Sequence, residues 1–228
     1  MILVTGATGL LGSHLLIQLT EQGETCRALY RNKTKIEDVR GLFHYYFQER
    51  AEEKWSSIEW VYCDLLDISL VETAMSEISH VYHCAALVSF FKADFEACIQ
   101  HNRIATANVV NFSLRNKVEK LCYVSSTAAV GVNAKGASTE ANKWEPGSEV
   151  SGYSVSKFLA EKEVWRGIEE GLNAVIINPC VIFGPGDWNS SSLAIFKAAK
   201  KGMPFLSQYL SFELASIVER CIKSFVPL

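Results

Sequence analysis

The chain has 228 residues, of which 49% are hydrophobic and 21% charged, and its formal net charge is −3. This length suits one good-sized core, or a large domain with a small appendage. The near-neutral charge gives no reason to expect a nucleic-acid partner. No apolar run approaches the roughly 20 residues of a membrane-spanning helix, so we expect no membrane segment.

The seven cysteines are scattered, without a C-x-x-C pair or a histidine at metal-ligand spacing. His83 and Cys84 are adjacent, but neighbours on a strand face opposite ways, so we expect no metal site. Met1 leads directly into an apolar run that lacks the basic region and cleavage site of a signal peptide. Reduced cysteines and a cytoplasmic location are the simplest expectation.

Short apolar runs alternate with longer helical patterns along the chain. The runs predict strands at Ile2–Thr5, Thr25–Tyr30, Ile58–Cys63, His80–Cys84, Leu121–Ser125 and Ala174–Ile177. The helical patterns are clearest at Gly12–Glu21, Ser69–Ile78, Phe95–Arg115 and Tyr153–Glu170. This alternation predicts an α/β fold with a doubly wound parallel sheet, the Rossmann fold.

A glycine loop follows the first predicted strand, in the sequence TGATGLLG. Gly6, Gly9 and Gly12 stand at the turn from strand to helix. Glycines there permit a tight turn and a close approach of a diphosphate, while the helix N-terminus offers free N–H groups. The pattern therefore favours dinucleotide binding over a glycine-rich turn that binds nothing.

The end of the second strand decides between NAD and NADP, because an acid there binds the ribose hydroxyls and a base suits the 2′-phosphate. The sequence has Arg31, Lys33 and Lys35 here, with no acid before Glu37. This favours NADP over NAD, although the same charges are also typical of a solvated loop. Asp64 follows the third strand. Its carboxylate is expected either to accept a hydrogen bond from the adenine amino group or to act as an ordinary turn or helix-cap residue.

Several motifs together resemble one family, the extended short-chain dehydrogenase/reductases. This branch includes nucleotide-sugar epimerases and dehydratases, dihydroflavonol reductases and 3β-hydroxysteroid dehydrogenases. The motifs span nearly the first 190 residues in family order. They are T-G-x-x-G-x-x-G at Thr5–Gly12, Asp64, HCAA at His83–Ala86, HNRIAT with Asn102, YVSS at Tyr123–Ser126, Y-x-x-x-K at Tyr153–Lys157, and NPCVIFGPGD at Asn178–Asp187.

The resemblance implies a catalytic set of Ser126, Tyr153 and Lys157. Tyr153 and Lys157 are four residues apart, so helical geometry lets them meet. By resemblance Tyr153 is the general acid/base, Lys157 lowers its pKa and binds the nicotinamide ribose, and Ser126 stabilises the oxyanion. Ser125 is expected to line the nicotinamide, and strand-end capping is the alternative for both serines.

The resemblance also implies which residues contact the cofactor and which hold the site. Asn102 matches a structural asparagine of the family, although a solvent-facing position is the alternative. The expected cofactor contacts are Thr5, Gly6, Thr8, Gly9, Leu10, Gly12, Tyr30, Arg31, Lys35, Asp64, Leu65, Cys84, Ala85, Ala86, Ser125, Tyr153, Lys157, Pro179 and Val181.

Two domains are expected: an NAD(P)-binding domain over residues 1–177 and a small C-terminal substrate lobe over residues 178–228. Extended family members have a larger lobe, so we expect residues to be absent between Pro204 and Ser211. The family also implies a homodimer, formed by the helices Phe95–Arg115 and Tyr153–Glu170 and their mates.

The leading functional prediction is an NAD(P)-dependent oxidoreductase that acts on a carbonyl or secondary alcohol. Leu87, Val88, Phe90 and Phe91 follow the fourth strand and suit a hydrophobic small-molecule substrate, or are plain core. One alternative is a nucleotide-sugar epimerase or dehydratase with the same Tyr–Lys chemistry. Asn178, where many nucleotide-sugar enzymes carry arginine, counts mildly against it. A non-catalytic NAD(P)-binding regulatory protein is a third possibility.

Overall fold

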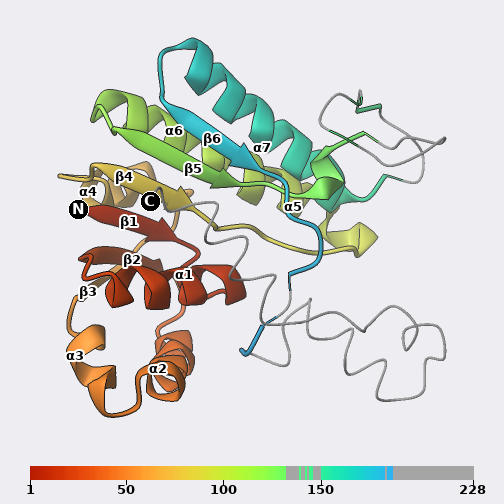
Figure 1. Ribbon diagram of the computed structural model, residues 1–228. Coiled ribbons are helices and arrows are strands. Elements are labelled where there is room, and N and C mark those ends of the chain that lie inside the picture. Colours follow the sequence, from red (N-terminus) through yellow and green to blue (C-terminus); the bar gives the residue numbers. More distant parts are fainter. Residues whose placement is uncertain (132–138, 140–141, 143, 146–149, 183, 187–228) are drawn as a thin grey trace, which may run out of the picture.

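The structure is a computed structural model, and it describes residues 1–131, 139, 142, 144–145, 150–182 and 184–186. Six parallel strands form one sheet in the order β3-β2-β1-β4-β5-β6, which confirms the doubly wound fold (Figure 1). Each predicted strand is present, with its ends within one residue of the prediction. The strands are β1 (Ile2–Thr5), β2 (Cys26–Tyr30), β3 (Ile58–Tyr62), β4 (His80–His83), β5 (Lys120–Val124) and β6 (Ala174–Ile177).

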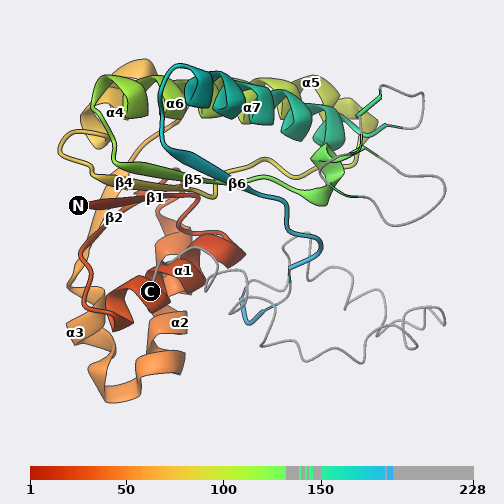
Figure 2. The same cartoon turned by 45° about the horizontal axis from the view of Figure 1, so that its top comes forward.

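Helices cover both faces of the sheet, with one group below it and one above it in Figure 2. The lower layer holds α1 (Leu10–Glu21), α2 (Thr34–Phe47), the 3₁₀ turn η1 (Gln48–Arg50) and α3 (Ala51–Trp55). The upper layer holds α4 (Ile68–Ala74), α5 (Phe95–Ile99), α6 (Ala105–Arg115) and α7 (Gly152–Glu169). Short 3₁₀ turns, η2 (Lys92–Asp94) and η4 (Thr127–Ala129), follow β4 and β5.

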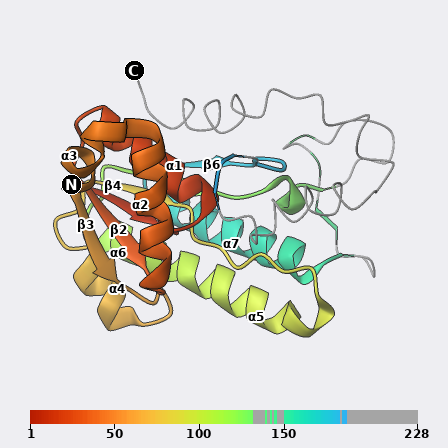
Figure 3. The same cartoon turned by 90° about the horizontal axis from the view of Figure 1, so that it is seen from below.

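The predicted helix Phe95–Arg115 is not a regular α-helix throughout. A π-helical segment, η3 (Gln100–Ile104), joins α5 to α6. Such wide turns are rare in proteins, and those that occur are often found at functional sites. Figure 3 shows the α5–α6 unit running beside α7.

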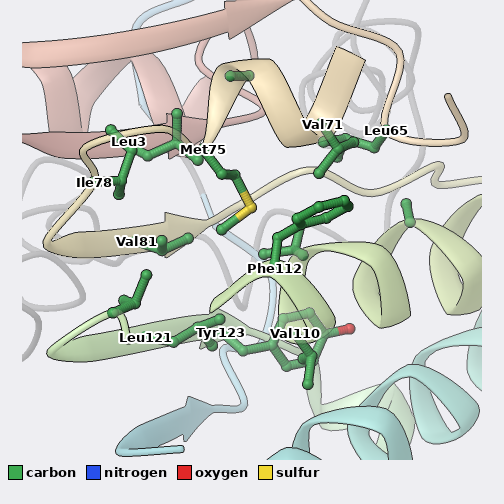
Figure 4. Close-up of a cluster of buried hydrophobic side chains, with 14 of the residues drawn as sticks. Leu3, Leu65, Val71, Met75, Ile78, Val81, Val110, Phe112, Leu121 and Tyr123 are labelled. Carbon is green, nitrogen blue, oxygen red and sulfur yellow. The ribbon is translucent and has the colours of Figure 1, made fainter. Parts of the chain in front are cut away.

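The core lies on both faces of the sheet, because neighbouring residues of each strand point to opposite sides. Leu3, Val81 and Leu121 of three adjacent strands pack with Met75 and Phe112 under the upper helices (Figure 4). The residues that follow these three in sequence pack toward the lower helices: Val4, Tyr82 and Cys122. Burial on both faces explains why the strands read as continuous apolar runs.

The C-terminal ends of the strands meet at one edge, where doubly wound folds bind their ligands. No helix in the described part of the chain is long and apolar enough to cross a membrane. Most of the predicted lobe, the stretch 204–211 and Cys221 lie outside the described residues.

Candidate functional site

The glycine turn joins β1 to α1 in a form that only glycine adopts easily. Gly6 has φ +65°, and a Cβ there would lie 2.7 Å from the backbone nitrogen of Ala85. A Cβ on Gly12 would overlap the carbonyl oxygen of Gly6, so α1 packs directly on the turn. Gly9 is the N-cap of α1 and provides no side-chain cap. The turn therefore presents backbone N–H groups to the cleft beside it.

This cleft has a volume of about 550 Å³ and lies at the C-terminal ends of β1 to β4. The structure brings together in its wall many of the residues expected at the cofactor: Thr5, Gly6, Thr8, Gly9, Tyr30, Arg31, Lys35, Asp64, Leu65, Cys84, Ala85 and Ala86. It does not place the other expected residues in that wall: Leu10, Gly12, Ser125, Tyr153, Lys157, Pro179 and Val181.

The wall also contains residues that sequence reasoning did not select for the cofactor: Leu29, Asn32, Cys63, Leu66, Leu87, His101, Asn102 and Ala105. Most of them adjoin a selected residue in the chain. His101 and Asn102 differ, because they reach the cleft from the π-helical turn η3. A local π-helix has no sequence signature, so His101 could not be selected in advance.

The basic loop after β2 forms one end of the cleft. Arg31 and Lys35 line it, whereas Lys33 does not. Neither Arg31 nor Lys35 has an acidic partner among the described residues. Asp64 is the only carboxylate in the described wall of the cleft. Its Oδ1 accepts a hydrogen bond of 3.0 Å from the Leu66 N–H, so Asp64 shapes a turn and also faces the cleft.

Lys157 lies at the centre of the fold rather than on its surface. Its side chain is 1% exposed, and Nζ donates a hydrogen bond of 2.7 Å to the carbonyl of Val124 at the end of β5. Nζ also lies 4.4 Å from the centre of the Tyr123 ring. Burial lowers the pKa of Lys157 to about 7, while the charge of Glu161 acts in the opposite direction.

Tyr153 lies one helical turn before Lys157 on α7. Burial raises the pKa of its phenol, and a hydrogen bond with the Ser126 side chain acts against this effect. The charge of Cys98 raises the pKa of this phenol as well, so desolvation outweighs the hydrogen bond with Ser126. Ser126 Oγ also accepts a hydrogen bond of 3.1 Å from the Ala128 N–H. Ser126 therefore both caps η4 and meets Tyr153.

His83 links the end of β1 to the start of α6. Its Nδ1 lies 2.7 Å from Thr5 Oγ1, and its Nε2 lies 3.0 Å from Thr106 Oγ1. Thr106 Oγ1 donates its proton to the carbonyl of Asn102, so it must accept from His83 Nε2–H. Burial lowers the pKa of His83 to about 3, which keeps the ring neutral.

Asn102 is buried, so the structural position is correct and the solvent-facing alternative is wrong. Its Oδ1 accepts a 2.7 Å hydrogen bond from the Leu87 N–H, and its Nδ2 donates to the Leu87 carbonyl at 2.9 Å. Nδ2 also donates to Ser156 Oγ, which in turn donates to the Tyr153 carbonyl. The side chain thereby fixes the loop after β4 against α7.

The loop after β4 exposes aromatic side chains beside Tyr153. The rings of Phe90 and Tyr153 are 5.7 Å apart in an edge-to-face arrangement. Phe90 is 69% exposed and Phe91 is 78% exposed. In the described structure these rings are surface, so the plain-core alternative is wrong for Phe90 and Phe91. Exposed apolar rings beside a phenol suit contact with an apolar ligand.

The segment after β6 forms the other side of the site. The Asn178 side chain donates hydrogen bonds to the Ser126 carbonyl and to Glu161 Oε1. The carbonyl of Pro179 accepts a 3.0 Å hydrogen bond from the Thr127 N–H, while Val181 is 46% exposed. No group of three or more potential metal ligands occurs among the described residues.

Comparison with known proteins gives a consistent set of relatives. A model of the NAD dependent epimerase/dehydratase family matches residues 2–206. Sterol demethylase protein B of Methylococcus capsulatus is 32% identical over 192 residues, which are 83% of this chain and 53% of that protein. A putative dihydroflavonol 4-reductase of Synechocystis is 32% identical over 185 residues, which are 81% of this chain and 50% of that protein.

Solved structures share the fold. The structure of gox2253 has a TM-score of 0.71 at 31% identity and covers 90% of this chain and 59% of its own. UDP-glucuronic acid 4-epimerase from Bacillus cereus, in complex with NAD, has a TM-score of 0.69 at 22% identity. It covers 88% of this chain and 62% of its own, and at this identity it shows the fold alone. The chain thus spans about half the length of the curated relatives it matches.

Proposed function

Because the chain belongs to the NAD-dependent epimerase/dehydratase family, we propose that it is an NAD(P)-dependent oxidoreductase that reduces a hydrophobic carbonyl or oxidises the matching secondary alcohol. The observation that carries this proposal is the hydrogen bond between Tyr153 and Ser126, one helical turn from the buried Lys157. The charge of Lys157 acts in turn on Cys84, which lines the cleft of the glycine turn. The activity of these residues and the identity of the substrate are both part of the proposal.

The cleft fits a dinucleotide. The absence of a Cβ at Gly6 and Gly12 and the uncapped start of α1 leave a backbone cradle that suits a diphosphate. A nicotinamide bound there supplies or accepts the hydride. The residues proposed to hold the dinucleotide are those expected at the cofactor from the sequence, joined by His101 and Asn102 from η3.

The proton that accompanies the hydride is assigned to Tyr153. Burial holds the proton on its phenol near neutral pH, so the resting side chain is ready to act as a general acid toward a carbonyl oxygen. Ser126, in contact with that phenol, is proposed to donate to the same oxygen as charge develops. Lys157 is held below them by the Val124 carbonyl and is proposed to bind the nicotinamide ribose.

The substrate is proposed to be apolar around its carbonyl. Phe90 contacts Tyr153 directly, and Val88 and Phe91 are exposed on the same loop. The family relatives include a putative dihydroflavonol 4-reductase, whose name supports this class. An epimerase would regenerate its cofactor in place, so stoichiometric NADPH consumption distinguishes the two activities.

NADP is proposed as the preferred cofactor, because Arg31 and Lys35 line the cleft without an acidic partner in the described chain. Arg31→Ala and Lys35→Ala should each weaken NADPH binding about tenfold and leave NADH binding within twofold. Lys33→Ala is the matched control, because Lys33 lies on the same loop outside the cleft wall. Fluorescence titration with both cofactors measures these constants. Equal losses for NADPH and NADH would contradict the preference.

Tyr153→Phe removes the proposed acid and keeps the ring that Phe90 contacts. We expect kcat for NADPH-dependent reduction of hydrophobic ketones to fall about 10²- to 10⁴-fold, with NADPH binding retained. Nicotinamide absorbance, followed over a panel of hydrophobic carbonyls and nucleotide sugars, measures the rates. Unchanged turnover in the variant would show that another group supplies the proton.

We also propose a two-part chain, with the cofactor domain over residues 1–177 and a substrate lobe over residues 178–228. A cytoplasmic location is proposed as well. It is supported by the free state of every cysteine in the described chain, since such thiols are typical of reducing compartments.

A further inference from the structure

Glu161 lies on the same face of α7 as Tyr153 and Lys157, because the three residues follow one another at intervals of four. It is half-buried, and its charge raises the pKa of Lys157 against the effect of burial. The roles proposed for the catalytic and cofactor-binding residues do not require a carboxylate at this position.

Asn178 connects this carboxylate to the catalytic serine. It follows β6, which lies beside α7 (Figures 1 and 2). One N–H of its side-chain amide donates a hydrogen bond of 3.1 Å to the Ser126 carbonyl, and the other donates to Glu161 Oε1. Both donors are therefore used, and the loop after β5 is tied to α7 one turn beyond Lys157.

The contacts form a closed circuit around the proposed proton donor. Tyr153 meets Ser126, the Ser126 backbone meets Asn178, and Asn178 meets Glu161. Glu161 faces Lys157 electrostatically, and Lys157 lies one turn from Tyr153. A side chain that closes such a circuit restricts the positions of the groups on either side of it.

We propose that Glu161 and Asn178 are positioning residues of the reductase site. Glu161 sustains the ammonium form of Lys157, and Asn178 fixes Ser126 within reach of Tyr153. The inference rests on the proposed function, because it gives these two residues a role in that same proton transfer.

Other titratable groups also face Lys157. His83 and Cys84 approach from the end of β4, and the Tyr123 ring covers Nζ from β5. Burial lowers the pKa of His83 to about 3 and raises that of Cys84 to about 12, so both are neutral near pH 7. Glu161 is then the only anion among these groups.

Glu161→Gln removes the charge and keeps an oxygen for Asn178. Loss of the carboxylate lowers the pKa of Lys157 further, so the ammonium is lost at lower pH. The pH at which NADPH binding weakens should fall by about one unit. Glu169→Gln is the matched control, since it removes one exposed charge from the same helix. Any titration of the cofactor itself affects the Glu161→Gln and Glu169→Gln variants equally. Coincident curves for the two variants would overturn the role of Glu161.

Asn178→Ala removes the hydrogen bonds to the Ser126 carbonyl and to Glu161. It leaves the hydrogen bond from Lys157 to the Val124 carbonyl in place. We expect kcat to fall about tenfold, with KM and the Kd for NADPH within twofold, and with the thermal midpoint showing that the variant is folded. A kcat within twofold of the parent would overturn the role of Asn178. If the parent binds NADPH and reduces ketones and the variants behave like it, only this inference is refuted. A parent that binds no NADPH refutes the proposed function as well.

Discussion

Lys157 is a buried amine that donates a hydrogen bond to the carbonyl of Val124. Its burial disfavours the charged form, and the Tyr123 ring and the Glu161 carboxylate compensate only in part. Such a residue is costly for the fold and useful for the site. The cost should therefore be visible as a dependence of stability on pH.

The folded-state pKa of Lys157, about 7, lies below its unfolded value of 10.5. The unfolded chain therefore binds the extra proton between these values, and the contribution of Lys157 to stability rises with pH across this window. The full penalty is present below pH 7. Lys157→Met should remove this rise and stabilise the protein below about pH 7 by about 1 kcal/mol, after the lost hydrogen bond to Val124 is counted.

Urea unfolding of the parent and the Lys157→Met variant, at several pH values across this window, measures the effect. Lys162→Met is the matched control, because Lys162 lies exposed on the same helix and its loss should leave the pH profile unchanged. A stability difference that does not vary with pH would show that Lys157 titrates normally in the folded protein.

At the scale of elements, η3 holds the site together through one amide. Asn102→Ala would leave the N–H and the carbonyl of Leu87 without their partner, and buried polar groups left unpaired are costly. We expect a loss of about 2–3 kcal/mol in the free energy of unfolding. NADPH binding should also weaken, because both Asn102 and Leu87 line the cleft.

Asn111→Ala provides the comparison for this variant. Asn111 lies on α6 and accepts an exposed hydrogen bond from Arg166, so its removal should cost less than about 0.5 kcal/mol. Denaturant unfolding and NADPH titration of both variants give the two quantities. If Asn102→Ala were as stable as Asn111→Ala, the clamp on the β4 loop would not contribute to the fold.

The elements show what a single sequence can predict here. All six strands were predictable, because a strand buried on both faces is a continuous apolar run such as Ile2–Thr5. Helix α2 was not, because only Val39 and Phe43 of its residues are fully buried and its pattern is weak. The π-helical turn was not predictable either, since the contacts of Asn102 that accompany it join residues distant in sequence.

The features of the candidate site likewise divide into local ones, which the sequence predicts, and those that depend on the packing of the whole fold. The turn at Gly6 and the spacing of Tyr153 and Lys157 are local features, and the sequence carries them directly. Burial raises the pKa of the Tyr153 phenol, and the sequence does not carry this effect, because desolvation depends on what the whole fold packs around the phenol. The pairing of Asn178 with Glu161 likewise depends on β6 lying beside α7.

At the scale of the whole molecule, the upper helical layer exposes some large apolar side chains among charged ones. Trp165 on α7 is 54% exposed and Ile104 of η3 is 46% exposed, whereas the neighbouring Val164 is fully buried in the core. A groove of about 420 Å³ lies beside Ile104, with Arg103 and Glu163 paired at 3.0 Å in its wall. These residues lie on the helices through which the family resemblance implies a homodimer, and we propose that dimer here.

Trp165→Glu should convert the proposed dimer to a monomer, because it would place a charge among apolar side chains at the interface. Tyr45→Glu is the control, since Tyr45 is 69% exposed on α2, in the opposite layer, and should leave the dimer intact (Figure 2). Light scattering coupled to size-exclusion chromatography measures the mass of each protein. A monomeric parent would contradict the homodimer, and a Trp165→Glu variant that stays dimeric would place the interface on another face.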